Sequence, residues 1–423
     1  MKMKSFVASF CDERFFRAFM KYWIYIMCLT LAVSSCIEEY SIPKNISYGQ
    51  KQMVIQGHIL AGEQSVFYLN YTKSFGDMTL LQETILNAKV NIIGKNGYES
   101  SMAKFDIEQD RYYIDTRSLE PNTLYAVKVE AEGEIYQSDF LSLLETPEIE
   151  EINYTEQEER ITFHVSTKND NDASRYYMWS FEEDWEFTAS VDFASFPNKY
   201  YYMQDTYPMN SSEVQTYYRC WNHNESSKVY LASTEHLEEN SIKNQMLFSI
   251  PTDDARISRV YSLLLKQLTL SKEAYTYYSH IKKLTEENSG IFQPIPYEVY
   301  GNVSCISKPE QKVLGYILAS NISTKRIFVN AADFKKCIPI YTGVCAETEL
   351  PATMIANRKL LTFELIGGAV LFDPSGHNYD LNEDPWELEF KGNELLYSRQ
   401  CVDCRTVKGA TNKRPDFWPN NHE

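Results

Sequence analysis

Hydrophobic and polar residues alternate over several short stretches in the first half of the chain, a pattern typical of strands that bury one face. These stretches are residues 53–59, 65–69, 88–92, 119–129 and 134–140. Asn96-Gly97 suits a tight hairpin turn because both residues tolerate positive φ, and Glu132-Gly133 marks a second turn. The pattern predicts a small antiparallel β-sandwich domain over residues 53–146.

One spacing within this domain narrows the expected fold. Leu119, Pro121 and Tyr125 are spaced as in the tyrosine corner of immunoglobulin-like and fibronectin-like sandwiches, in which the tyrosine hydroxyl bonds back to nearby backbone. We therefore expect an immunoglobulin-like or fibronectin-like β-sandwich. His58 falls on the strand face opposite Ile55, and as a lone histidine it is expected to be solvated.

Pro147 and the acidic residues after it mark the start of a larger β-rich domain, residues 147–423. Its predicted strands include residues 160–166, 175–187, 228–233, 260–270, 311–320 and 325–330. A helix is predicted over residues 271–288, because Ser271 can cap its first turn and one face carries Ala274, Tyr277, Tyr278, Ile281 and Leu284. The predicted fold class is mainly β, with at least one helix in the second domain.

The beginning of the chain has the layout of a lipoprotein signal peptide. Residues 22–32 are apolar but too short to span a bilayer as a helix, and they lead into Val33, Ser34, Ser35 and Cys36. An aliphatic residue three before the cysteine and small residues between them fit the signal peptidase. Cys36 is therefore expected to carry acyl chains such as palmitate; the alternatives are a buried core segment and an ordinary membrane anchor.

This interpretation divides the first 52 residues into a signal peptide, residues 1–35, and a polar tether, residues 36–52. Residues 1–19 include acidic side chains that a signal-peptide n-region lacks, so translation is expected to start at Met20; the alternative is a long n-region. Several acyl chains on Cys36 would hold the protein on the membrane essentially permanently. The acidic residues just after Cys36 resemble the signal that exports lipoproteins to the outer face of the outer membrane, the alternative being a merely solvated tether.

The chain is strongly acidic, with 41 basic and 58 acidic residues and a formal net charge of −17. Without residues 1–35 there remain 36 basic and 56 acidic residues, a formal charge of −20. Nucleic acid and anionic lipid repel such a chain, so membrane attachment must come from the lipid. The 31 tyrosines are expected to fill strand faces; the alternative is a surface that stacks sugars.

The mature chain keeps six cysteines: Cys220, Cys305, Cys337, Cys345, Cys401 and Cys404. An even number in an exported protein predicts structural disulfides, although 15 connectivities are open. The alternatives are a zinc site built from the last four and a redox CxxC at Cys401 and Cys404. The redox alternative lacks the flanking βαβ pattern.

Motifs of enzymes are absent from the sequence: it has no nucleophile elbow, Walker loop, dinucleotide fingerprint or zinc-protease helix. Residues 168–172 resemble the start of a calcium loop, but the glycine and the final glutamate are missing, so a turn is expected. Acidic and aromatic residues are interleaved in a stretch that holds Trp179, Glu182, Glu183, Asp184, Trp185, Glu186 and Phe187. A glycosidase would need two carboxylates across one cleft, whereas a polar strand face beside core aromatics explains the stretch adequately.

Several short motifs follow one another along the mature chain. They are Tyr176-Tyr177-Met-Trp179 with Trp185, Cys220-Trp221, Tyr261 to Gln267, Phe292-Gln-Pro294, Gly301-Asn302-Val303, Gly315-Tyr316, Cys401-Val-Asp-Cys404 and Phe417-Trp418. This ordered set resembles the Bacteroidetes lipoproteins of domain-of-unknown-function family 4249. The resemblance implies structural roles for Tyr177, Trp179, Trp185, Trp221, Gly301, Asn302, Phe417 and Trp418, and disulfide bridges at Cys401 and Cys404.

Members of that family are secreted lipoproteins without an established activity, often regarded as companions of TonB-dependent transporters. The leading expectation is a lipid-anchored, non-enzymatic outer-membrane protein, an accessory or binding component of a TonB-dependent system that takes up a small nutrient or glycan. The alternatives are a free-standing surface module that binds glycan or protein, and a hydrolase. No catalytic residue, cofactor or metal ligand is assigned.

Overall fold

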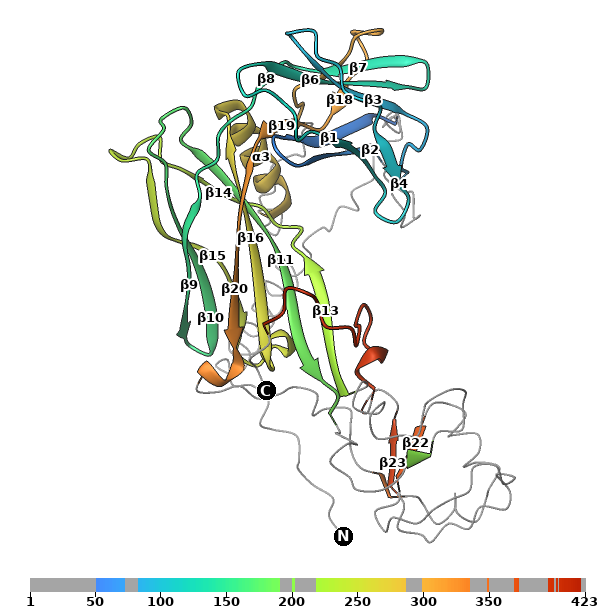
Figure 1. Cartoon of the computed structure of the whole chain (residues 1–423), viewed down its shortest axis with the longest axis vertical. Helices are drawn as coiled ribbons and strands as arrows, with labels where there is room; N and C mark the ends of the chain where they lie inside the picture. Colours follow the sequence, from blue (N-terminus) through green and yellow to red (C-terminus); the bar gives the residue numbers. More distant parts are fainter. Residues whose placement is uncertain are drawn as a thin grey trace, which may run out of the picture. The chain divides into compact units, whose positions relative to one another are not determined.

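The computed structural model is mainly β, which confirms the predicted fold class (Figure 1). It describes residues 51–72, 83–190, 200–201, 218–286, 299–334, 348–349, 369–372, 395–398, 401 and 403–419. The predicted signal peptide with Val33, Ser34, Ser35 and Cys36, most of the tether, and the cysteines Cys337 and Cys345 lie outside these residues.

The first domain consists of two sheets that share one hydrophobic core. One sheet has the order β18-β1-β2-β5-β4, with β19 also on β1, and the other has the order β17-β7-β6-β3, with β8 on β6 (Figure 1). The strands before residue 146 are β1 (Met53–Leu60), β2 (Gln64–Tyr71), β3 (Lys89–Gly94), β4 (Lys104–Asp106), β5 (Arg111–Asp115), β6 (Leu124–Ala131), β7 (Glu134–Ser138) and β8 (Leu141–Ser142). Alternate residues such as Ile55, Phe67 and Val127 enter the core, as the sequence pattern predicts.

The local features predicted for this domain are present. The Tyr125 hydroxyl accepts a hydrogen bond from the Glu120 N–H at 2.8 Å and donates one to the Glu120 carbonyl at 3.1 Å, which is the bonding of a tyrosine corner. Gly97 and Gly133 both have a φ of 83°, the left-handed conformation that tight turns require.

Three strands of the first domain come from residues assigned by sequence to the second. β18 (Val313–Leu314) and β19 (Ile317–Ser320) pair in parallel with β1, and β17 (Val303–Cys305) pairs with β7. The backbones approach closely here, because an added Cβ at Gly301 would lie 1.6 Å from the Gly315 carbonyl oxygen. The first sandwich is therefore completed only by residues 303–320.

The second domain is a sandwich of two further sheets. One has the order β15-β10-β9, and the other has β13-β11-β16-β20 with β14 also on β11 (Figure 1). The strands are β9 (Ile149–Gln157), β10 (Arg160–Lys168), β11 (Tyr176–Thr188), β13 (Arg219–Glu225), β14 (Tyr230–Ser233), β15 (Ser241–Pro251), β16 (Val260–Leu270) and β20 (Ile322–Asn330). Their shared core includes Phe163, Trp179 and Leu263.

Several short elements complete the description. A separate sheet has the order β12-β22-β23-β21, built from β12 (Tyr200–Tyr201), β21 (Thr348–Glu349), β22 (Ala369–Phe372) and β23 (Leu395–Ser398). The described residues also contain the 3-10 helices η2 (Ala255–Ile257), η3 (Ala331–Asp333) and η4 (Cys404–Thr406).

The predicted helix is present as α3 (Lys272–Glu286). Its start is capped by Ser271, whose hydroxyl accepts a hydrogen bond from the Ala274 N–H at 3.1 Å. Ala274 and Tyr277 are buried against the ends of β11 and β16, together with Met178, Leu268 and Leu270. The helix thus covers one part of the outer face of the β13-β11-β16-β20 sheet.

Two chain segments cross between the sandwiches side by side. The Leu144 N–H donates to the Ala319 carbonyl and the Asn321 N–H donates to the Leu144 carbonyl, both at 3.1 Å. Thr146 reinforces the pair, since its hydroxyl donates to the Asn321 carbonyl at 2.8 Å and accepts from the Thr269 N–H at 3.0 Å. The crossing is therefore a hydrogen-bonded ribbon of two segments.

His58 lies on the predicted strand face beside this crossing, but it is not simply solvated. Its side chain is half-buried, and Nε2 lies 2.9 Å from the Ser320 hydroxyl. Burial lowers the pKa of His58 to about 3, because a charged imidazole would lose its hydration there. The expectation of a solvated histidine is wrong because β19, unforeseen as its neighbour, covers it.

Candidate functional site

The acidic stretch of β11 is the centre of the candidate site, and its carboxylates divide between the two faces of the sheet. Successive side chains of a strand point to opposite faces, so Glu183 lies with Trp179 on the inner face, while Asp184 and Glu186 lie on the outer face. Their side chains are no more than 9% exposed. Buried carboxylates require partners, and each of them has an arginine.

Glu183 is held on the inner face by three donors. Its carboxylate accepts from Arg256 Nη1 and the Tyr261 hydroxyl, both at 2.7 Å, and from Asn224 Nδ2 at 2.9 Å. Arg256 also bonds Asp254 through Nε and Nη2, and this pair raises the pKa of Arg256 above its ordinary value. Burial, with the nearby charge of Glu183, raises the pKa of Tyr261 well above its ordinary value. The group is a closed ion-pair network in the core.

Asp184 is the centre of a second group on the outer face. Arg326 Nη1 lies 2.7 Å from its Oδ2, and His223 Nδ1 lies 2.8 Å from its Oδ1. Arg326 also donates to the Ser262 hydroxyl at 2.6 Å, and its guanidinium carbon lies 3.7 Å from the centroid of the Phe417 ring. The His223 side chain is 55% exposed, so this group borders solvent.

Glu186 binds two arginines through a single oxygen atom. Arg259 Nε lies 2.8 Å and Arg219 Nε lies 3.4 Å from its Oε1, and Trp418 Nε1 donates to Oε2 at 3.1 Å. The Glu186 side chain is 3% exposed, whereas those of Arg259 and Arg219 are 34% and 39% exposed. The carboxylate is therefore buried while its two arginines reach the surface.

The C-terminal segment, residues 404–419, is fastened along β13 and brings Trp418 to this outer face. A disulfide joins Cys404 to Cys220 of β13, and the backbones of Trp221 and Thr411 exchange two hydrogen bonds at 2.8 and 2.9 Å. The Trp418 ring packs edge-on against Trp221 and Phe328. The segment thus reaches Glu186 with the indole of Trp418, 232 residues later in the sequence.

The other aromatic motif residues lie within the second sandwich. The Tyr177 hydroxyl donates to Asn240 Oδ1 at 2.7 Å, and the Trp179 indole donates to Gln267 Oε1 at 2.8 Å. Trp185 is partly buried against the core. These positions provide packing and internal hydrogen bonds.

The six predicted disulfide cysteines divide into three groups. Cys220 and Cys404 are bonded to each other, and Cys401 is also disulfide-bonded. Cys305 is a free, buried thiol, so its expected bridge is wrong: β17 places it in the core of the first sandwich, with the Ser307 hydroxyl 3.5 Å away. Cys337 and Cys345 lie outside the described residues.

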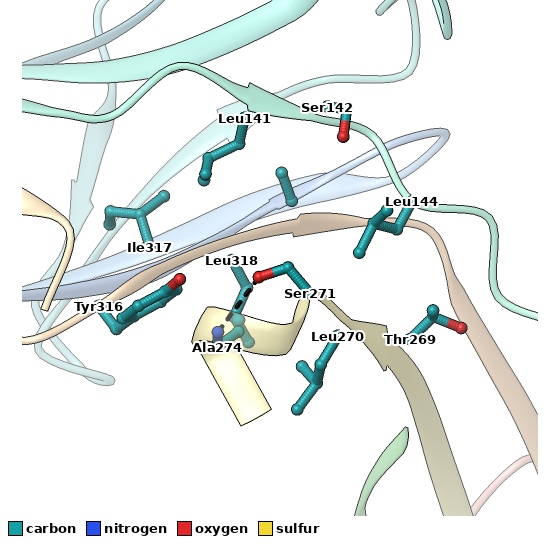
Figure 2. Close-up of a pocket in the computed structure, with 11 residues that line it drawn as sticks. Leu141, Ser142, Leu144, Thr269, Leu270, Ser271, Ala274, Tyr316, Ile317 and Leu318 are labelled. Atoms are coloured by element: carbon teal, nitrogen blue, oxygen red, sulfur yellow. Dashed lines mark hydrogen bonds between the residues drawn. The ribbon is translucent and has the colours of Figure 1, made fainter. Parts of the chain in front are cut away.

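A cavity lies at the crossing between the sandwiches, and Figure 2 shows its lining. It has a volume of about 50 Å³ and is lined mainly by aliphatic side chains, among them Leu141, Leu144, Leu270, Ile317 and Leu318. Such a volume holds a few water molecules and no sugar or other organic ligand. We therefore place the candidate site on the outer face of the sheet and not in this cavity.

Every buried carboxylate of β11 is already engaged by a cation. Within the described ranges, no group of histidine, cysteine and acidic residues is arranged to hold a metal ion. Among the same residues, no helix is both long and apolar enough to cross a membrane.

Sequence reasoning found the acidic stretch and the tryptophans but missed the four arginines that pair with them. These arginines come from three separate parts of the chain. Arg219 and Arg326 reach β11 through strand pairing, whereas Arg256 lies in η2 and Arg259 lies just before β16. One signal was available in the sequence: each buried acidic side chain of a strand needs a basic side chain from a neighbouring segment as its partner.

Comparison with known proteins identifies a family for this chain. A family model described as "Domain of unknown function (DUF4249)" matches residues 37–326, and no curated protein matches. A two-domain fibronectin type-III segment from chicken tenascin is similar at 10% identity and a TM-score of 0.15, over 52% of this chain and 91% of that one. A structure of Gaeumannomyces graminis manganese lipoxygenase with part of Komagataella pastoris zonadhesin is similar at 7% identity and a TM-score of 0.11, over 53% and 90%. Scores this low bear on neither fold nor function.

Proposed function

This chain belongs to the DUF4249 family, and on that premise we propose that it is a non-enzymatic lipoprotein of the outer membrane, anchored through Cys36. Its role would be that of an accessory or binding component of a TonB-dependent nutrient-uptake system, with a small nutrient or glycan as ligand. The signal-peptide layout before Cys36 supports the anchor, and the strongly acidic composition argues against attachment by charge.

The observation that carries the binding role is the state of the β11 carboxylates. Catalytic acids and bases need a free carboxyl group that faces a substrate. Glu183 and Glu186 instead lie under their arginines, with side chains only 3% exposed, and Asp184 is bonded on both oxygens. This network stiffens the sheet and fixes the surface around it, which supports recognition by a preorganised surface.

A second candidate function, a free-standing module that binds glycan or protein, is favoured by one surface feature. Phe417 is 44% exposed, and it lies over Arg326 close to the half-exposed His223. An aromatic ring beside fixed polar groups is a common arrangement for binding a sugar ring or a partner side chain. The two candidates differ in whether a membrane channel is a stoichiometric partner.

The anchor is tested by cell fractionation of two variants in the native host. Cys36→Ala should move the protein out of the membrane fraction, because no acyl chain can be attached. Cys28→Ala is the matched control, since it removes a cysteine from the same predicted signal peptide and should leave fractionation unchanged. Membrane attachment of Cys36→Ala equal to that of the wild type would refute the anchor.

The partner is tested by purifying the tagged lipoprotein from its own outer membrane in a mild detergent. Recovery of one TonB-dependent channel at near-equal amount supports the uptake role and directs the ligand search to that channel. Recovery of the lipoprotein alone contradicts that role and favours the free-standing module, which glycan and protein binding screens would then examine.

A further inference from the structure

We propose that Arg219 and Arg259 form a binding site for an oxyanion, a carboxylate or phosphate group of a small ligand, on the outer face of the second sandwich. This deepens the proposed binding function by naming the chemistry of a ligand. It rests on that binding role and is independent of any membrane channel.

The first argument is the way in which the two arginines are held. Both bond the same atom, Glu186 Oε1, through Nε. Among the residues that the structure describes, neither guanidinium has another polar partner, so the paired Nη groups of both remain available. A guanidinium uses two parallel N–H groups to grip a carboxylate or phosphate, and two guanidiniums side by side can bind one oxyanion from two directions.

The second argument is preorganisation. Glu186 is buried, and its other oxygen accepts the indole N–H of Trp418, which is packed between Trp221 and Phe328. The disulfide of Cys404 with Cys220 closes the C-terminal segment onto β13, the strand that carries Trp221. The carboxylate that orients both arginines is thereby fixed before any ligand arrives, which reduces the entropy cost of binding.

The third argument is local charge. Glu186 carries one negative charge against the two positive charges of its arginines, which leaves one positive charge in excess. This local excess favours an anion over a neutral ligand.

The fourth argument is access. The side chains of Arg219 and Arg259 are 39% and 34% exposed, so their free edges can reach a ligand without unfolding any element. Arg256 has the opposite arrangement: it lies at 29% exposure and is engaged by both Asp254 and Glu183. The pair at Glu186 is therefore a site with unused donors, whereas Arg256 is a structural arginine.

The test measures binding of inorganic phosphate and of glucuronate to the purified full chain in neutral detergent, at constant ionic strength. Calorimetry gives the dissociation constant, and tryptophan fluorescence reports on Trp418 beside the site. Glucose is the uncharged control for glucuronate. If phosphate alone binds saturably, the ligand carries a phosphate group. If glucuronate alone binds, the ligand is an acidic sugar or another carboxylate. Binding of both anions supports the general class of oxyanions.

Substitutions of the two arginines test whether the anion binds at this site. Arg219→Gln and Arg259→Gln should each weaken binding about tenfold, because each removes a charged hydrogen-bond donor, and the double variant should abolish it. Arg117→Gln is the matched control. Arg117 also pairs with an acid, Asp115, but it lies on the first sandwich, so this variant should bind the anions as the wild type does. The near-UV circular dichroism of the tryptophans checks that each variant is folded.

Two results would overturn the inference: no saturable binding of either anion to the wild type, or wild-type affinity in the folded double variant. If the glutamine variants do not fold, Arg219→Lys and Arg259→Lys decide instead, since lysine keeps the charge but lacks the planar fork. Weaker binding by the lysine variants supports the site, and unchanged binding contradicts it. A channel found or absent in the purification of the native lipoprotein has no influence on these outcomes.

Discussion

The side chain of Asn302 and the backbone of Ile317 are joined by two hydrogen bonds. Asn302 Oδ1 accepts from the Ile317 N–H at 2.8 Å, and its Nδ2 donates to the Ile317 carbonyl at 2.9 Å. The side-chain amide of Asn302 thus satisfies the backbone N–H and carbonyl of Ile317 in β19, as a neighbouring strand would. Because the Asn302 carbonyl also accepts from the Asp139 N–H at 2.8 Å, one residue links β19 to the chain between β7 and β8.

Gly301, next to this asparagine, should not tolerate a side chain. In Gly301→Ala the new Cβ would meet the Gly315 backbone, and neither backbone can move away cheaply, so we expect a loss of at least about 3 kcal/mol in the free energy of unfolding. Gly97→Ala is the control, with no atom near the added Cβ but a positive φ, and should cost about 1–2 kcal/mol. Denaturant unfolding measures both, and equal losses would contradict the close-packing argument.

Arg256 should be far more important for stability than a surface arginine. Arg256→Ala leaves Glu183 charged, buried and without a cation, which should lower the free energy of unfolding by about 3–5 kcal/mol at neutral pH. Arg117→Ala breaks an exposed pair with Asp115 and should leave the unfolding midpoint almost unchanged. Urea denaturation of both variants tests this, and a small effect of Arg256→Ala would mean that Tyr261 and Asn224 suffice to hold the carboxylate.

Cysteine labelling should separate Cys305 from the bridged cysteines. In denaturant without a reductant, an alkylating reagent should modify Cys305 and leave Cys220, Cys401 and Cys404 unmodified until a reductant is added. Peptide mapping by mass spectrometry measures this, with Cys305→Ser as the control that loses the early label. Labelling of Cys220 and Cys404 before reduction would disprove their bond.

His58 should make stability depend on pH in mildly acidic solution. Its pKa is lowered from 6.5 to about 3 in the folded chain, so below pH 6.5 the unfolded chain takes up a proton that the folded chain does not. The stabilising contribution of neutral His58 is therefore complete above pH 6.5 and decreases as the pH falls toward 3. His58→Gln, which keeps a polar partner for Ser320, should show a shallower decrease between pH 7 and 5 in denaturant titrations.

A slope in this pH range that is identical in both proteins would assign the effect to the other histidines. Above pH 7 the two proteins should respond alike to pH, because His58 is neutral in both the folded and the unfolded chain there.

Local signals allowed much of the fold to be predicted from sequence. The tyrosine corner of Tyr125 depends on residues five positions apart, and the helix α3 depends on one cap and one apolar face. β16 matches its predicted range of residues 260–270 because that run is apolar on both faces and therefore buried. These features are encoded by neighbours in sequence and need no knowledge of the tertiary fold.

The parts that sequence reasoning missed depend on pairs of distant residues. The parallel pairing of β1 with β19 joins segments about 260 residues apart, as in the contact of His58 with Ser320, and nothing in either segment identifies the other. Cys305 looked like the other cysteines because a count of residues carries no information about burial. The candidate site has the same character, since Arg219 and Arg259 reach Glu186 only through the register of β11 with its neighbours.

The return of residues 303–320 to the first sandwich imposes an order on how the chain matures. When residues 53–146 leave the ribosome, one edge of β1 is still open, and it stays open until more than 150 further residues have been synthesised. Contacts between such distant segments form slowly. The first domain therefore cannot close until most of the second has been synthesised. A chain cut short before residue 303 lacks the strands β17, β18 and β19 of the N-terminal sandwich, a state that quality-control proteases can recognise.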